Sequence, residues 1–446
     1  MSLLANGNIK SADRKEGRLT EDPEPIGRLN WLIHLIHVRG DAVSCKDLIR
    51  NEIDASQGKN EFAHYKKAII LREEGKVQES LEAFQICHKL DMEDVDNLKE
   101  IGKCLFMLRR YRLALEAYSE AEKVASKSDW EIYHKIAECY MQLNDINMAK
   151  ENANKAIKLS HQENVFSLFI QILCAEGNFN GAIDVCNKAV ASCPDSVNVL
   201  TKSGLLYLKV GINQHAFERL SSALALDPLN PRALLGIGCI TQNHAEYDVA
   251  LSKYKIAVQS DTESVALWNN IGLCFYSKQK YIAAVTCLKR ALWLSPMNWK
   301  VLLNLGLLHL ATSQPASAFN FLCSAVNLRP DLGLPFMILA CALLELNDTE
   351  NALRAMRQAI ALNGDEPLIL ANTCLCLLLA GHREAAKEIM NQIKENEEIN
   401  NSELNALLKN LDITLDGDEH TELLVTNSGN EIIDSTENFD GDEDLV

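Results

Sequence analysis

Small or compact apolar residues recur along almost the whole chain at a spacing close to 34 residues. From most of these positions, which we call anchors, an alanine follows twelve residues on, a large apolar residue sixteen on and another alanine nineteen on. After Gly272, for example, these residues are Ala284, Leu288 and Ala291. Successive anchors are 35, 34, 35 and 33 residues apart and then 34 apart six times, a register that chance periodicity in a leucine- and alanine-rich chain would not keep. The eleven anchors are Ile33, Ala68, Gly102, Ala137, Ile170, Gly204, Gly238, Gly272, Gly306, Ala340 and Cys374.

Each repeat is predicted to form two amphipathic helices, because its apolar residues follow one another at three- and four-residue spacing. The small residues let two helix backbones approach closely, and the large residue between the alanines fills the remaining gap. A single helix pair cannot bury its apolar face, so neighbouring repeats must stack. Proline disfavours continuation of a helix and therefore marks the ends of repeats, at Pro194, Pro228, Pro296 and Pro330. The pattern predicts an all-α solenoid of about eleven helix pairs over residues 29–396.

The start of the repeat resembles the tetratricopeptide repeat. Trp268, Ile271, Gly272 and Phe275 approximate the tryptophan, leucine, glycine and tyrosine that open a repeat of that family. The resemblance implies a superhelical solenoid that serves as a binding surface. Enzymes with such repeats append a catalytic domain, and we expect none here because the array occupies most of the 446 residues.

The residues outside the array are expected to be disordered. Residues 1–28 are polar, contain Pro23 and Pro25, and lack the continuous apolar core of a signal peptide. Residues 397–411 hold a candidate capping helix. Residues 412–446 form an acidic tail with twelve Asp and Glu and no Lys or Arg, so the rest of the chain carries only −5 of the net charge of −17. Such a tail is usually a solvated solubiliser, and docking onto a basic partner is the functional alternative.

Two stretches of the array, residues 333–346 and 368–380, are markedly apolar. Each is shorter than the roughly 20 apolar residues that span a bilayer. Because each occupies the first-helix position of a repeat, we expect both to be core helices.

The sequence offers no recognisable catalytic, cofactor or metal site. Its fourteen cysteines lie mainly at helix-face positions, as buried thiols do, and indicate a reducing, cytosolic compartment rather than disulfides. Cysteine pairs with metal-ligand spacing are absent, and His34 and His37 lack an apparent third ligand. Gly236 and Gly238 lack the third glycine and the preceding strand of a dinucleotide loop. We therefore predict a protein that is not an enzyme and binds no cofactor, metal ion or nucleic acid.

The first helix of each repeat is expected to line an inner groove. The residues six and three before an anchor, and one and four after it, would then point inward. In the N-terminal repeats these positions are polar, and toward the C-terminus they become apolar, which marks a binding surface. We expect a peptide or helix to bind there, and a double substitution Leu307→Asp and Met337→Asp to leave the array folded but abolish partner retention. The alternative is that tight curvature or a terminal helix covers the groove. The predicted groove residues are Lys300, Leu303, Leu307, Leu310, Leu334, Met337, Cys341 and Leu344.

A co-chaperone function can be tested on the same positions. Co-chaperones with this repeat hold a C-terminal carboxylate with Lys and Asn in one repeat, Asn in the next, and Lys and Arg in a third. Two of the five matching residues fit, and the Lys–Asn pair that should grip the carboxylate is missing, so this function is not favoured. The residues at those positions are Leu235, Cys239, Asn270, Lys300 and Asn304.

Several stretches resemble the Bardet–Biedl syndrome protein 4 family, a tetratricopeptide-repeat subunit of the BBSome. They are residues 30–35 (NWLIHL), 78–82 (QESLE), 268–272 (WNNIG), 287–291 (CLKRA) and 304–307 (NLGL). The resemblance covers about residues 29–395 and also follows the order of the repeats.

This resemblance implies a non-catalytic scaffold subunit of a coat-like complex that moves membrane proteins to and from the cilium and supports cilium assembly. It implies as partners the other Bardet–Biedl syndrome proteins, including a small extended subunit in the groove, together with centriolar satellite and dynein-associated proteins. Membrane contact would come only through the complex. It also implies cytoplasmic location, at the cilium, the ciliary base and basal body (centrosome) and the centriolar satellites. The alternatives are a repeat subunit of another large assembly, such as the anaphase-promoting complex, and a free-standing adaptor.

Overall fold

The computed structural model describes residues 27–363 and 367–395. Within these residues the chain forms 22 α-helices and no strand. The all-α fold of eleven helix pairs is therefore confirmed. Residues 1–26 of the N-terminal segment 1–28 that was predicted to be disordered, the acidic tail 412–446 and the candidate capping helix 397–411 lie outside the described residues.

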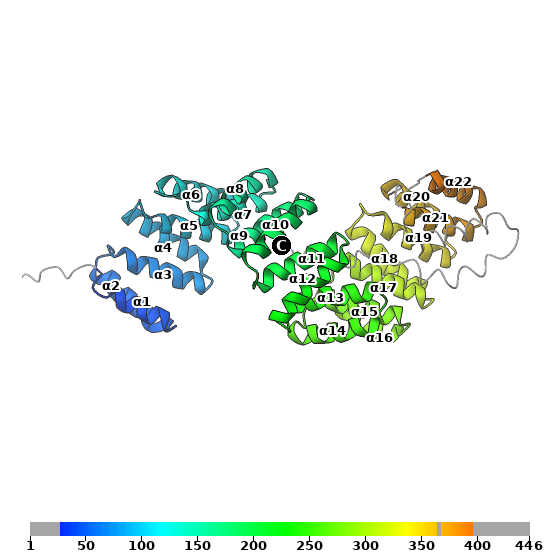
Figure 1. Ribbon diagram of the computed structural model, residues 1–446, viewed down its shortest axis with the longest axis horizontal. Helices are drawn as coiled ribbons and strands as arrows, with labels where there is room; N and C mark the ends of the chain where they lie inside the picture. Colours follow the sequence, from blue (N-terminus) through cyan, green and yellow to red (C-terminus); the bar gives the residue numbers. More distant parts are fainter. Residues whose placement is uncertain (1–26, 364–366, 396–446) are drawn as a thin grey trace, which may run out of the picture. The chain divides into compact units, whose positions relative to one another are not determined.

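The helices alternate as first and second members of the eleven repeats (Figure 1). The first helices are α1 (Asn30–Val38), α3 (Glu61–Glu73), α5 (Val95–Met107), α7 (Trp130–Gln142), α9 (Glu163–Ala175), α11 (Val197–Lys209), α13 (Pro231–Asn243), α15 (Val265–Ser277), α17 (Trp299–Ala311), α19 (Gly333–Glu345) and α21 (Pro367–Leu379). The second helices are α2 (Ala42–Ala55), α4 (Val77–Leu90), α6 (Tyr111–Val124), α8 (Ile146–Leu159), α10 (Phe179–Ser192), α12 (Asn213–Leu226), α14 (Tyr247–Ser260), α16 (Tyr281–Leu294), α18 (Pro315–Leu328), α20 (Thr349–Asn363) and α22 (Arg383–Glu395).

The chain divides into two compact units, and the division falls inside α9. The N-terminal unit ends at Ile172 and the C-terminal unit begins at Leu173. In both units the two helices of a repeat pack on each other, and the second helix also packs on the first helix of the next repeat. Each unit is therefore a stack of helix pairs with a hydrophobic core that runs along it.

Close helix packing explains the period of the sequence. Every anchor is buried, and at the five glycine anchors the large residue sixteen positions later lies directly against it. A Cβ atom added to Gly272 would lie 2.7 Å from the Leu288 Cγ, and one added to Gly102 would lie 2.6 Å from the Tyr118 ring. Because real Cβ contacts are longer, these anchors must stay small for the pair to close.

A left-handed residue joins the two helices in every repeat. It stands seven positions after the anchor, where it ends the first helix with its backbone in a conformation that suits glycine. Gly75 has φ 82°, and Lys76 N–H then donates to the Leu71 carbonyl over 2.9 Å. Other residue types take the same conformation at several of these turns, including Ala245 at φ 59° and Gln279 at φ 57°. This regular turn fixes the angle between the two helices of each repeat.

The boundaries between repeats lie where the prolines predicted them. Pro194, Pro228, Pro296 and Pro330 each stand two residues after the end of a second helix. The next first helix then begins with a side-chain cap in the first three cases, since a Ser or Asn oxygen accepts a backbone N–H of the first turn. The capping residues are Ser196, Asn230 and Asn298.

The two apolar stretches are first helices, as expected. They form α19 and α21, and buried side chains of both helices belong to one core cluster of the C-terminal unit. No helix in the described ranges combines the length and the apolar character needed to cross a membrane. All fourteen cysteines fall within the described residues, where each is a free thiol that is buried or half-buried.

Candidate partner-binding groove

First helices of the C-terminal unit lie side by side along one face of the stack. Each of α11, α13, α15, α17 and α19 packs on the first helix of the following repeat. Among the described second helices, no two successive members pack on each other to a similar extent. The first helices are therefore closer together than the second helices, which places them on the concave side of the stack.

The eight predicted groove residues divide into two sets. Leu303, Leu307 and Met337 are buried by the chain itself, with 6%, 8% and 1% of their surface exposed. They form part of the core cluster between adjacent first helices, and Met337 Sδ accepts a hydrogen bond from the Thr373 hydroxyl of α21 over 3.2 Å. The other five are half-buried: Lys300, Leu310, Leu334, Cys341 and Leu344.

Burial of the first set corrects the expectation about Leu307→Asp and Met337→Asp. Adjacent first helices close over Leu307 and Met337, so a carboxylate at either position would have little access to water. An unpaired buried charge costs several kcal/mol. The double variant is therefore expected to unfold this region, and a test of binding needs the half-buried positions instead.

The position four after the anchor gives a continuous half-buried row from α11 to α19. Leu310 and Leu344 belong to it, and Leu208, Gln242 and Tyr276 extend it along α11, α13 and α15, all half-buried. The latter three were not singled out from the sequence, although the same spacing rule reaches them. Burial, with a smaller effect of Tyr281, raises the pKa of Tyr276 to about 12, so its hydroxyl keeps its proton at neutral pH.

In the N-terminal unit several of the inward-facing positions of the first helices carry an ion-pair network. Glu100 on α5 pairs with Arg72 of α3 and with Lys103, whose Nζ lies 2.9 Å from Oε1 of Glu100. Lys103 also reaches Glu131 Oε1 on α7 over 3.1 Å, and Lys99 reaches Glu131 Oε2 over 3.4 Å. Lys99 pairs in addition with an aspartate at each of positions 96 and 129. The charges thus bridge successive first helices and largely neutralise one another.

The network holds its members in their charged forms. Burial opposes the charge on Lys99 and Lys103, but hydrogen bonds and charges of their acidic neighbours outweigh it and raise the pKa of both. Burial likewise opposes the charge on Glu131 and Asp129. Lys103 and Lys99 outweigh it at Glu131, and Lys99 with the Glu131 backbone N–H outweighs it at Asp129, so the pKa of both carboxyl groups is lowered. The N-terminal groove is therefore polar and charged at neutral pH, unlike the C-terminal one.

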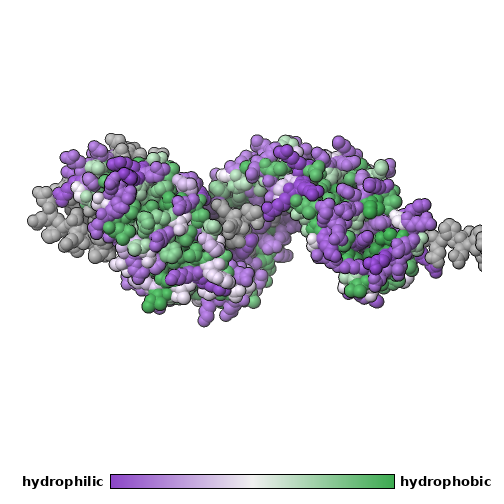
Figure 2. Space-filling model, turned by 180° about the vertical axis from the view of Figure 1, so that it is seen from behind, coloured by the Kyte–Doolittle hydropathy of each residue, from purple (hydrophilic) through white to green (hydrophobic). Residues whose placement is uncertain are grey.

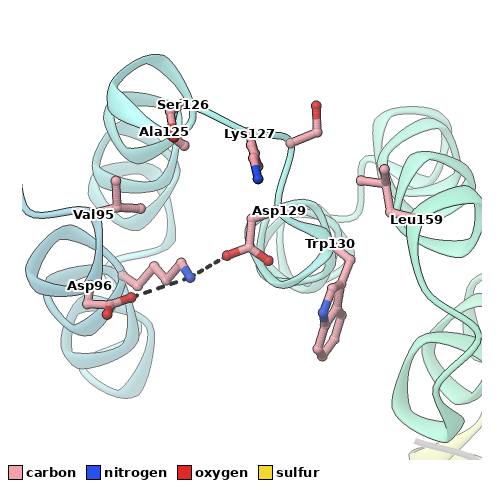
Figure 3. Close-up of a pocket in the computed structure, with 10 residues that line it drawn as sticks. Val95, Asp96, Ala125, Ser126, Lys127, Asp129, Trp130 and Leu159 are labelled. Atoms are coloured by element: carbon pink, nitrogen blue, oxygen red, sulfur yellow. Dashed lines mark ion pairs between the residues drawn. The ribbon is translucent and has the colours of Figure 1, made fainter.

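A shallow pocket of about 420 Å³ lies at one end of this network (Figure 3). Figure 3 shows Asp96 and Asp129 on either side of a lysine side chain, with the Trp130 ring on the α7 side and Leu159 across the pocket. Its lining mixes ion pairs with apolar surface. In the described parts of the chain no group of three or more His, Cys, Asp or Glu is placed to hold a metal ion.

The residues at the co-chaperone positions are mostly inaccessible. Leu235, Cys239, Asn270 and Asn304 are between 1% and 8% exposed. The Asn270 amide donates to Cys239 Sγ over 3.2 Å. The structure therefore adds a second reason against carboxylate capture at this site.

Comparison with known proteins decides the family. BBSome complex member BBS4 of Bos taurus is 42% identical over 378 residues, which cover 84% of this chain and 73% of the relative. The Xenopus tropicalis BBSome complex member BBS4 is 46% identical over 374 residues, 83% of this chain and 72% of the relative. The chain belongs to the BBS4 family. This confirms the resemblance found in the sequence.

Two further comparisons confirm the fold of this BBS4 family member. The tetratricopeptide repeat family model matches residues 131–162, 265–296 and 336–366. The crystal structure of the APC/C hetero-tetramer Cut9–Hcn1 matches with a TM-score of 0.50 over 86% of this chain and 89% of that chain. At 16% identity, the latter likeness shows the solenoid fold alone.

Proposed function

We propose that this chain is a non-catalytic scaffold subunit of the BBSome, a coat-like complex, and supports cilium assembly and the trafficking of membrane proteins to and from the cilium. The observation that carries the proposal is the identity to BBS4 proteins, which extends over more than four fifths of the chain. The fold supports it, because stacked helix pairs give long surfaces for other chains. The protein would act in the cytoplasm, at the cilium, its base and basal body, and at centriolar satellites.

The proposed partners are the other Bardet–Biedl syndrome proteins, with a small extended subunit along the groove of the C-terminal unit. The half-buried row through Leu310 and Leu344 supports this binding site, since an extended chain could bury those apolar side chains. Centriolar satellite and dynein-associated proteins are proposed as further partners, and contact with membranes would come through the complex.

Purification of the tagged chain from ciliated cells tests the assignment. Mass spectrometry of its stoichiometric companions should identify the other Bardet–Biedl syndrome proteins. Companions from the anaphase-promoting complex, or none at all, would contradict the proposal and favour another assembly or a free-standing adaptor.

A double variant, Leu310→Lys with Leu344→Lys, tests the groove itself. The lysine stem can cover the same apolar surface while its ammonium reaches water, so the fold should survive. Two lost apolar contacts at about 1.5 kcal/mol each correspond to roughly 100-fold weaker binding. We expect at least tenfold less of the small subunit in pull-downs from co-expressing cells.

Ile282→Lys with Val249→Lys provides the matched control. These side chains are 90% and 44% exposed on the second helices α16 and α14, away from the groove. The control should keep the small subunit. If the folded groove variant retains as much of the small subunit as the control does, the subunit does not bind in this groove. BBSome membership would be unaffected by that result.

A further inference from the structure

The first repeat leaves an apolar stripe of α1 uncovered. Trp31, Leu35 and Val38 recur at four- and three-residue spacing, and they are 65%, 40% and 69% exposed. In Figure 2 hydrophobic side chains reach the surface at the lower edge of the N-terminal unit, where α1 lies. The helices on which α1 packs are α2 and α3, and both follow it in the chain. Among the described residues, no helix therefore packs on the side of α1 that would meet a preceding repeat.

The same positions are closed in the later repeats. Leu35 stands two residues after its anchor, and the equivalent residues elsewhere are at most 5% exposed. They are Ile70, Cys104, Cys139, Ile172, Leu206, Ile240, Cys274, Leu308, Ala342 and Cys376. Trp31 stands two residues before its anchor, where the residues of later repeats are buried or half-buried.

Contacts inside the stack show what closes these positions. Cys104, the counterpart of Leu35, lies 3.6 Å from the Ser80 hydroxyl on the second helix of the preceding repeat. Asn304, a counterpart of Trp31, donates to Asn269 on the preceding first helix over 2.8 Å. Both helices of a preceding repeat therefore cover the edge that α1 exposes.

We propose that a helix pair of another BBSome subunit packs on Trp31 and Leu35 and continues the stack across the subunit boundary. The inference rests on the proposed function, because the partner is sought within that assembly. It is a different surface from the groove, which lies on the C-terminal unit. The proposed contact has the same form as the packing between successive repeats of this chain, and it would bury the exposed apolar residues of α1.

The side chains also define the partner's chemistry. Small residues face this edge inside the stack, as Ser80 does, so the partner's second helix should present Ala, Gly or Ser opposite Leu35. Trp31 is the bulkiest residue at its position among the eleven repeats, so the partner must be recessed there. A flat or strongly charged helix would leave the indole exposed.

Hydroxyl-radical footprinting of the wild-type chain, alone and within the purified assembly, tests the proposal. Oxidation of the Trp31 ring should be at least fivefold slower in the assembly. A photo-crosslinking amino acid at position 35 should join to a helix pair of another subunit. Trp31→Asp with Leu35→Lys should lower incorporation at least tenfold, whereas Val43→Lys, at a 73% exposed position on α2, should not.

The charges in the double variant suit the α1 termini, so the isolated variant should unfold at the wild-type temperature. Equal oxidation of Trp31 in both states, with the other subunits present, would overturn the inference and leave the proposed function intact. If Trp31 is oxidised slowly in the isolated chain, and deletion of residues 1–26 makes its oxidation faster, a segment of the same chain covers the ring instead. A crosslink to a second copy, or to a segment that is not a helix pair, would also overturn it. Absence of the other subunits would defeat both proposals.

Discussion

The contact between an anchor and the large residue sixteen positions later can be tested at Gly306 and Leu322. A Cβ added to Gly306 would lie 2.6 Å from both Cγ and Cδ2 of Leu322, which is 0% exposed. Overpacking costs about 1–3 kcal/mol. Alanine gains about 1 kcal/mol over glycine within a helix. Gly306→Ala alone should therefore change stability by about 0–2 kcal/mol in the unfavourable direction.

In a Leu322→Ala background, Gly306→Ala should change stability in the opposite direction. The reason lies in what Leu322→Ala removes. Alone it leaves a cavity and costs about 3–5 kcal/mol. The alanine lacks the Cγ and Cδ atoms that the new Cβ of residue 306 would meet. In this background Gly306→Ala should stabilise by about 1 kcal/mol through helix propensity. The coupling between the two substitutions is then about 1–3 kcal/mol.

Native-state hydrogen exchange of α17 and α18 amides is the suitable assay, because stacked repeats need not unfold as one unit. Leu288→Ala in the preceding repeat is the matched control, since Leu288 packs on Gly272. In the Leu288→Ala background, Gly306→Ala should change stability by the same amount as it does in the wild-type chain. Additivity of the Gly306 and Leu322 substitutions within about 0.5 kcal/mol would refute this explanation of the repeat period.

Two further properties follow from the turns and the ion pairs. Ala245→Gly should raise the stability of its repeat by about 1 kcal/mol, because the left-handed conformation penalises a Cβ; a lowered thermal midpoint would contradict this. In the N-terminal unit, the lowered pKa values of Asp129, Glu131 and Glu138 contribute stability at pH values above the ordinary carboxyl range and lose it as pH falls through the lowered values. Circular dichroism should therefore show a loss of stability below about pH 4, and a Lys99→Met variant should lose less between pH 5 and pH 3.

The sequence was sufficient to predict the fold because the packing that sets the period is local. An anchor and its partner sixteen residues on belong to one helix pair, so the small–large pattern of Gly272 and Leu288 can be seen in a single repeat. The left-handed turn was not predicted as a feature of every repeat. Residues as different as Gly75, Gln279 and Asn347 occupy it, so composition gives no uniform signal there.

The groove was predicted less completely, because accessibility depends on the distance between neighbouring first helices. Helix periodicity shows that Met337 and Leu344 both face inward, but it does not show that α21 closes over Met337 while Leu344 stays half-buried. The uncovered edge at Trp31 was missed for a related reason, since its exposure depends on what packs against α1 among the described residues and not on its own repeat.

The native size of the protein in a ciliated cell tests the central claim most directly. A lysate from cells that carry a tag on the endogenous chain should be separated by sedimentation, with the sizes calibrated. The account predicts that most of the protein sediments with other Bardet–Biedl syndrome proteins in a particle several times heavier than the 49.7 kDa chain. Sedimentation of nearly all of it as a monomer, with none of those proteins in the same fractions, would contradict the account.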